Sequence, residues 1–213
     1  VDSLEAVYAL LGERVTAATV ALLNPDNVVS GWSSPPSLAA VESLLTTGDL
    51  CCRLWWQDAI DQAQPVLADH PDFSPLLIMV AFSHANLGRI READSVLAVV
   101  DTLSERLTTS ERLLADWLRA RLSGNRAEAT LAIEQAYRID PVGRGLHAGS
   151  NALETNRFQD ALERLLSADR DSPCLRNFWP LWHGIAQAYH MLGRYEEELE
   201  VAREALERFP NVR

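Results

Sequence analysis

The sequence predicts an all-α protein, a right-handed α-solenoid of about five helix pairs with a capping helix at its amino end. Three observations lead to this prediction. A hinge residue is repeatedly followed, five positions later, by alanine, as in Gly88 to Ala93 and Gly124 to Ala129. Successive hinges are 34, 36, 32 and 37 residues apart, and a fixed period of this size is typical of stacked repeats. Most periods close at a proline, which a helix interior does not tolerate.

The first 37 residues do not repeat and are expected to form a region of their own, residues 1–37. Apolar side chains from Leu4 to Leu22 recur at helical spacing, which predicts one amphipathic helix over residues 2–23. Residues 28–36 contain Gly31, Pro35 and Pro36 and indicate an extended connection. Two interpretations stay open. The helix covers the open end of the solenoid, which we favour, or it is the last helix of a preceding domain.

The repeat region is predicted over residues 38–213, in two-helix units at 38–71, 74–104, 110–141, 142–173 and 179–210. The hinges end the first helix of a unit, where glycine takes the left-handed conformation easily and Asn156 is the next-best residue. The second helices are expected to end at Pro71, Pro141, Pro173 and Pro210. The unit around Gly88 lacks this proline, and Thr108 to Glu111 supply a helix start instead. The first unit is degraded, with Leu54 in place of a hinge glycine.

The spacing of Gly124, Ala129, Ala136 and Pro141 resembles the tetratricopeptide repeat, a helix-turn-helix of about 34 residues. In the last unit, Glu198 replaces the usual alanine, and the matching residues are Trp182, Tyr189, Gly193, Tyr195, Ala205 and Pro210. We expect Trp182 and Tyr189 to be core residues. The resemblance covers roughly residues 38–210. It implies a non-catalytic scaffold that binds a peptide or protein segment in a concave groove.

Residues 110–120 and 179–200 also resemble the carboxyl-terminal repeat region of bacterial multidomain signalling proteins. These include membrane-tethered serine/threonine kinases and one-component transcription regulators. The resemblance implies that the chain is the sensor or docking region of a larger protein, and that its partner is another protein or another domain of the same polypeptide.

The first helix of each pair is expected to line the inner face of the superhelix. The helical register then predicts a mixed, fairly apolar groove in which Arg121 is the one obvious cation. The peptide clamps of this family use several cations with asparagine to hold a terminal carboxylate, so a helix or an extended apolar segment fits this groove better. The predicted groove residues are Ile78, Phe82, Asn86, Leu118, Arg121, Leu146, Ser150, Glu154, Trp179, His183, Gln187 and His190.

Composition narrows the function further. With 30 acidic and 19 basic residues, the net charge is −11, which argues against a nucleic-acid partner because phosphates need a basic face. We expect no cofactor, no metal site and no catalysis, since the sequence has no phosphate-binding loop, nucleophile elbow or metal-ligand motif. No apolar run is long enough to span a membrane. The three cysteines, Cys51, Cys52 and Cys174, are expected to be reduced, which favours a cytoplasmic location.

Two alternatives to a peptide scaffold remain at this level. A small-ligand sensor would use the end of the groove at Trp179, His183 and Gln187. A homo-oligomerisation module would use an end of the solenoid, with Leu199 and Leu206 of the terminal helix as contacts.

Overall fold

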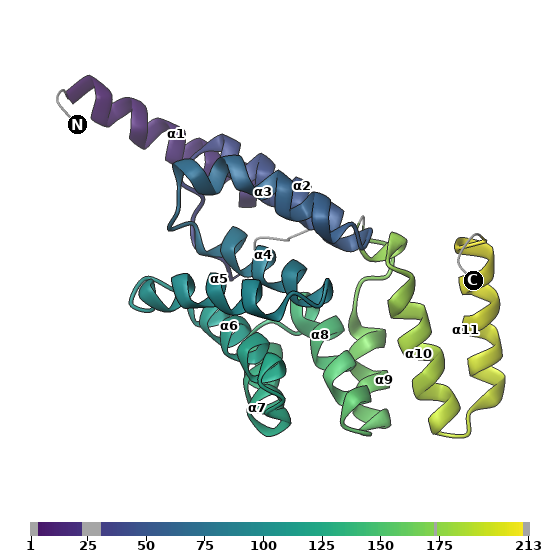
Figure 1. Cartoon of the computed structure of the whole chain (residues 1–213). Coiled ribbons are helices and arrows are strands. Elements are labelled where there is room, and N and C mark those ends of the chain that lie inside the picture. Colours follow the sequence, from purple (N-terminus) through teal and green to yellow (C-terminus); the bar gives the residue numbers. More distant parts are fainter. Residues whose placement is uncertain (1–3, 23–30, 173, 211–213) are drawn as a thin grey trace.

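The computed structural model describes residues 4–22, 31–172 and 174–210, and this part of the chain is α-helical with no strand (Figure 1). The predicted all-α class is therefore confirmed. The helices are α1 (Leu4–Leu22), α2 (Leu38–Cys52), α3 (Trp56–Asp69), α4 (Ser74–Asn86), α5 (Ile90–Thr102), α6 (Thr109–Leu122), α7 (Arg126–Ile139), α8 (Pro141–Glu154), α9 (Phe158–Ser167), α10 (Trp179–Met191) and α11 (Tyr195–Arg208), with a short 3₁₀ helix, η1 (Leu175–Asn177), before α10.

From α2 onward, consecutive helices pack as pairs: α2 on α3, α4 on α5, α6 on α7, α8 on α9 and α10 on α11. Each pair also packs on the next, and the junction of α5 with α6 is the looser one. Buried apolar side chains form successive clusters along the stack instead of one central core. Trp182 and Tyr189 lie in the carboxyl-terminal cluster, as predicted.

The hinges have the predicted backbone conformation. Gly88, Gly124 and Gly193 have φ of 72°, 74° and 71°, and Asn156 has φ of 58°. In the first unit Leu54 takes the left-handed conformation, with φ of 63°, although a side chain is disfavoured there. The turn geometry of the repeat is therefore kept even where glycine is missing.

The ends of the second helices agree with the prolines in three units. Helices α3, α7 and α11 end two residues before Pro71, Pro141 and Pro210. In the fourth unit α9 ends at Ser167, earlier than predicted, and Pro173 lies outside the described residues. Before α6, the expected helix start is a capping box, in which the Thr108 hydroxyl accepts from the Glu111 N–H at 3.2 Å and Glu111 Oε2 accepts from the Thr108 N–H at 2.8 Å.

Helix α1 rests on α2 through Ala17, which packs beside Val41 and Leu45. Figure 1 shows the rest of α1 extending away from the stack. Val7, Leu11 and Val15 are exposed, so the contact with the solenoid is made by the second half of the helix. Among the described helices, none has the length and apolar character needed to cross a bilayer.

The prediction of reduced cysteines is wrong for two of the three. Cys52, the last residue of α2, forms a disulfide with Cys174, in the connection between α9 and α10. Their Cα atoms lie 5.3 Å apart although the two residues are separated by 122 positions in sequence. Only the curvature of the stack brings them together, which sequence spacing does not report. Because disulfides are typical of oxidising compartments, the cysteines no longer favour a cytoplasmic location.

Candidate functional site: the concave face

An aromatic cluster gathers side chains from four helices on one face of the stack. The Phe82 ring of α4 lies 5.7 Å from Trp56 of α3, 6.0 Å from Trp117 of α6 and 5.7 Å from His147 of α8, centroid to centroid. The Trp117 and His147 rings are 5.1 Å apart. Helix α6 lies between α4 and α8 in the stack, so direct contact of Phe82 with His147 requires these helices to curve toward each other. This face is therefore concave, and we call these four residues the aromatic cluster.

A charged pair borders the aromatic cluster. Arg121 of α6 and Glu154 of α8 form an ion pair with N–O distance 2.9 Å, and both side chains are partly exposed. The Arg121 guanidinium also lies 5.1 Å from the centre of the Trp117 ring, a cation–π distance. The concave face thus combines an apolar floor with one cation and one anion at its edge.

The imidazole of His147 is neutral at physiological pH. Burial is the main cause that lowers its pKa to about 3, and the positive charges of Arg144 and Arg121 act in the same direction. His147 Nδ1 and Trp117 Nε1 are shielded from solvent and bond to no other described residue. The cluster therefore encloses an indole N–H and an uncharged imidazole, and neither polar atom is open to a ligand in this structure.

The amino ends of the first helices hold an extended stretch of the chain itself. The Ser33 N–H donates to Oε1 of the buried Glu111 at 2.8 Å, and the Thr108 hydroxyl donates to the Gly31 carbonyl at 2.6 Å. The Ser33 and Ser74 hydroxyl oxygens are 3.2 Å apart. The Arg144 guanidinium lies 5.4 Å from the centre of the Trp32 ring. Residues 31–35 thus lie across α4, α6 and α8 as an extended peptide bound by main-chain and side-chain contacts.

The structure brings three predicted groove residues together, Phe82, Arg121 and Glu154. Ile78 and Leu118 are buried in the core, with 5% and 2% of their surfaces exposed, and Trp117 of the aromatic cluster is buried in the same core, with 3% exposed. Asn86 is exposed and donates to the Phe82 carbonyl of its own helix. Two further predicted residues lie on α8: Leu146 packs against the carboxyl-terminal cluster, and Ser150 is half-buried.

The predicted residues on α10 form a separate group. Trp179 and His183 make an edge-to-face contact at 6.0 Å, and His183 and Gln187 are exposed. His190 turns toward α11, where its Nδ1 lies 3.0 Å from a carboxylate oxygen of Glu198. This contact gives a role to the glutamate that replaces the usual alanine of the repeat.

Trp56, Trp117 and His147 were missing from the predicted groove. Trp117 immediately precedes the predicted Leu118, and His147 immediately follows the predicted Leu146, so each lies one position from a residue of the predicted groove. One signal was present in the sequence, because Trp117 and Arg121 are four residues apart and share a helix face.

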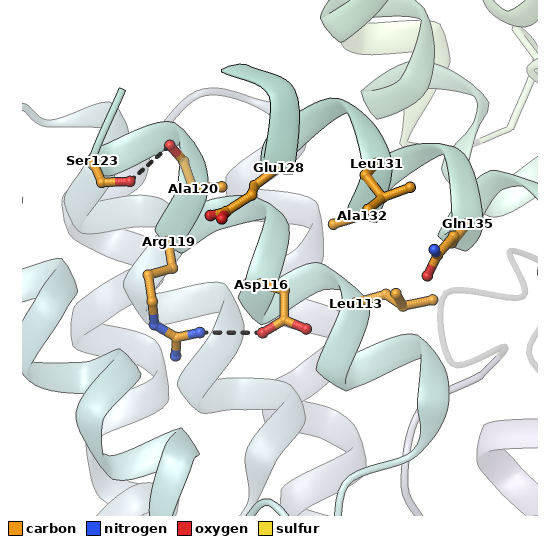
Figure 2. Close-up of a pocket in the computed structure, with 9 residues that line it drawn as sticks. All are labelled: Leu113, Asp116, Arg119, Ala120, Ser123, Glu128, Leu131, Ala132 and Gln135. Carbon is orange, nitrogen blue, oxygen red and sulfur yellow. Dashed lines mark hydrogen bonds and ion pairs between the residues drawn. The ribbon is translucent and has the colours of Figure 1, made fainter. Parts of the chain in front are cut away.

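A depression lies between α6 and α7 (Figure 2), and no residue of the aromatic cluster lines it. It has a volume of about 420 Å³ and a mixed lining, with Leu113 and Leu131 at one end and Asp116, Arg119 and Glu128 at the other. Arg119 is paired with Asp116 at 3.2 Å and with Asp101 of α5 at 2.5 Å. None of the residues predicted for a small-ligand site lines this depression.

Within the described residues, no group of three or more His, Cys, Asp or Glu side chains is arranged to hold a metal ion.

Comparison with known proteins agrees with this architecture. Residues 180–212 match the tetratricopeptide repeat family model. The structure is similar to that of TTC0263, a thermophilic TPR protein of Thermus thermophilus, with TM-score 0.54 and 21% identity over 80% of this chain and 91% of that chain. It is also similar to a chain of the APC/C hetero-tetramer Cut9–Hcn1, with TM-score 0.56 and 17% identity over 93% of this chain and 36% of that one.

No curated protein matches the chain in sequence. The structural likenesses support the fold, and the match to the family model covers α10 and α11. The sequence of the carboxyl-terminal helix pair therefore resembles a tetratricopeptide repeat, in a chain whose fold is similar to that of tetratricopeptide-repeat proteins.

Proposed function

We propose that this chain is a non-catalytic scaffold that binds a peptide or protein segment on its concave face, at the aromatic cluster and the Arg121–Glu154 pair. The tetratricopeptide-repeat fold is in general a protein-interaction scaffold, because stacked repeats create extended concave surfaces. The observation that carries the proposal is the convergence of Trp56, Phe82, Trp117 and His147 from four helices on that face.

The chemistry of this face favours a short apolar segment with at least one charged side chain. Aromatic rings and arginine are the residues most often found at interaction hot spots. Arg121 and Glu154 are partly exposed, so their ion pair contributes little to stability and is free to exchange for charges of a partner. The binding of residues 31–35 across α4, α6 and α8 further supports an extended segment as a ligand of the first helices.

We further propose that the scaffold is the docking region of a larger bacterial signalling protein and that the bound segment belongs to another domain of that protein or to a protein partner. The support is the resemblance of residues 110–120 and 179–200 to the repeat regions of such proteins. The net charge of −11 favours a basic or apolar partner.

Selection from a library of random peptides displayed on phage, with the native chain as bait, tests the binding proposal. A selected peptide, labelled with fluorescein, is titrated by fluorescence anisotropy against native protein and variants. We expect Arg121→Glu to weaken binding by about tenfold or more, the loss of a hot-spot contact. The matched control is Arg119→Glu, on the same helix but in the depression between α6 and α7, and it is expected to leave the affinity unchanged.

The proposal is wrong if no peptide is enriched. It is also wrong if the enriched peptides are insensitive to both Arg121→Glu and Phe82→Ala, since binding would then occur away from the concave face.

Self-association is the second candidate function, because Leu199 and Leu206 of α11 are 50% and 67% exposed. Light scattering of the native chain over a concentration series distinguishes it. A dimer that Leu206→Glu converts to monomer, with no peptide enriched in the selection, would make assembly through α11 the better explanation.

A further inference from the structure

The disulfide joins two parts of the stack that are far apart in sequence. In a solenoid each repeat contacts only its neighbours, so the repeat pattern alone does not hold distant units together. Cys52 belongs to the first helix pair, and Cys174 lies between the fourth pair and the fifth. Figure 1 shows the end of α2 and the start of α3 near the connection that leads into α10. The bond closes residues 52–174 into one covalent ring.

One end of this covalent loop lies beside the concave face. Trp56, four residues after Cys52, contributes its ring to the aromatic cluster. The neighbouring Cys51 Sγ lies 3.5 Å from the hydroxyl of Ser83, the residue after Phe82. On the other side, Cys174 is followed after η1 by Trp179 and His183. Both ends of the disulfide are thus attached to elements that carry aromatic side chains.

We propose that the Cys52–Cys174 disulfide is a redox clasp that restricts access to the concave face. When it is oxidised, the first helix pair is held against the connection before α10. A dithiol reductant opens it by transferring two electrons and two protons. The S–S bond breaks, both cysteines become thiols, and the reductant becomes a cyclic disulfide. The first helix pair then separates from that connection, and a bulky segment reaches the aromatic cluster more easily.

Two features suit the bond to this role. Neither Cys52 nor Cys174 is fully buried, so the bond lies near the protein surface. Cys51 is next in sequence but is a poor competitor for the bond, because burial raises the pKa of its thiol to about 11 and a protonated thiol does not attack a disulfide. The pairing of Cys52 with Cys174 is therefore protected from exchange with its neighbour.

The first part of the test concerns shape and does not depend on any ligand. The full chain is compared in oxidised form, after reduction by dithiothreitol, and as the variant Cys52→Ser/Cys174→Ser, with Cys51→Ser as the matched control. Differential alkylation and mass spectrometry report the state of each cysteine. We expect reduction and the double substitution, but not Cys51→Ser, to speed amide hydrogen exchange at the end of α2 and before α10, and to raise acrylamide quenching of tryptophan fluorescence.

The second part concerns access and rests on the proposed function. The association rate of the phage-selected peptide, fused to a folded carrier protein, is measured on the same samples. Because binding slows when a conformational change must come first, we expect reduction to raise the rate constant by roughly fivefold or more, within the usual range of coupling between sites.

Equal exchange and quenching in oxidised and reduced protein would overturn the clasp, whatever the peptide does. Changed exchange with an unchanged association rate would show an opening that does not control the concave face, which also overturns it. If no peptide is ever selected, the proposed function fails while the shape measurements still decide whether the clasp opens.

Discussion

Glu111 is a fully buried carboxylate that joins three parts of the chain. Its Oε1 accepts from the Ser33 N–H at 2.8 Å and from the Ser74 hydroxyl at 3.1 Å, and its Oε2 accepts from the Thr108 N–H at 2.8 Å. A buried charge is tolerated only where hydrogen bonds replace the lost water. The single side chain therefore caps α6, contacts the start of α4 and fixes the crossing stretch at Ser33.

Substitution Glu111→Gln tests this arrangement. The amide keeps one acceptor oxygen but turns an NH₂ group toward groups that donate, so at least one buried donor loses its partner. We expect a loss of about 1–3 kcal/mol in the free energy of unfolding, measured by urea denaturation followed by circular dichroism. The matched control is Glu128→Gln at the exposed start of α7, where a change within about 0.5 kcal/mol is expected. Equal losses in the two variants would contradict the role assigned to Glu111.

Of the contacts of Glu111, the sequence predicts the local one and not the distant one. The helix start at Thr108 to Glu111 follows from local hydrogen-bonding chemistry, which depends on residues three apart. The bond from Ser33 to Glu111 spans 78 positions. It depends on how three repeats stack, and no local pattern encodes that.

Helices α8 and α9 approach each other closely at Gly145, where α8 has no side chain. A Cβ atom added at Gly145 of α8 would lie 2.9 Å from the main-chain carbonyl oxygen of Arg164 and 3.2 Å from the hydroxyl of Ser167. Main-chain atoms of a helix do not move aside as a flexible side chain does. The absence of a side chain at Gly145 is therefore what lets the two helices approach.

The variant Gly145→Ala is expected to be destabilised by about 1–3 kcal/mol, the usual cost of overpacking, although alanine favours a helix. Thermal unfolding of the oxidised protein measures it. Gly12→Ala is the control, because a Cβ atom there meets no atom within 4 Å, and alanine in an exposed helix is favourable by up to about 1 kcal/mol. If Gly145→Ala were as stable as the native chain, the helices would have room to separate.

At the scale of elements, the sequence predicts well which segments form helices and where the turns lie. It predicts less well which side of each helix faces the inner side of the stack. Hinge positions follow from the left-handed turn, which depends on a few neighbouring residues. On α6, Trp117 and Leu118 are both apolar and both buried. A helix covered on several sides has apolar residues around much of its circumference, so its hydrophobic pattern does not identify the inner face.

At the scale of the whole molecule, the disulfide changes how the stack unfolds. Without a cross-link, a solenoid behaves as a row of units whose stability comes from each unit and its nearest neighbours. The Cys52–Cys174 bond closes a ring that includes most of the units. The units inside the ring are therefore expected to unfold as one body in the oxidised protein, whereas the reduced protein is free to lose its first helix pair separately.

Urea denaturation of the oxidised protein and of Cys52→Ser/Cys174→Ser measures this coupling. Removing a native cross-link costs about 2–5 kcal/mol, because a long closed loop limits the freedom of the unfolded chain. Because the closed loop keeps the unfolded oxidised chain more compact, less surface becomes exposed when it unfolds. If both proteins unfold in one step, the free energy of unfolding should therefore fall less steeply with urea concentration in the oxidised protein than in the variant. A variant that instead unfolds in stages shows separate transitions by fluorescence and by circular dichroism. Cys51→Ser, which keeps the ring, should follow the native curve. Coincident curves for native protein and double variant would mean that contacts between the units, and not the covalent ring, hold the first helix pair in place.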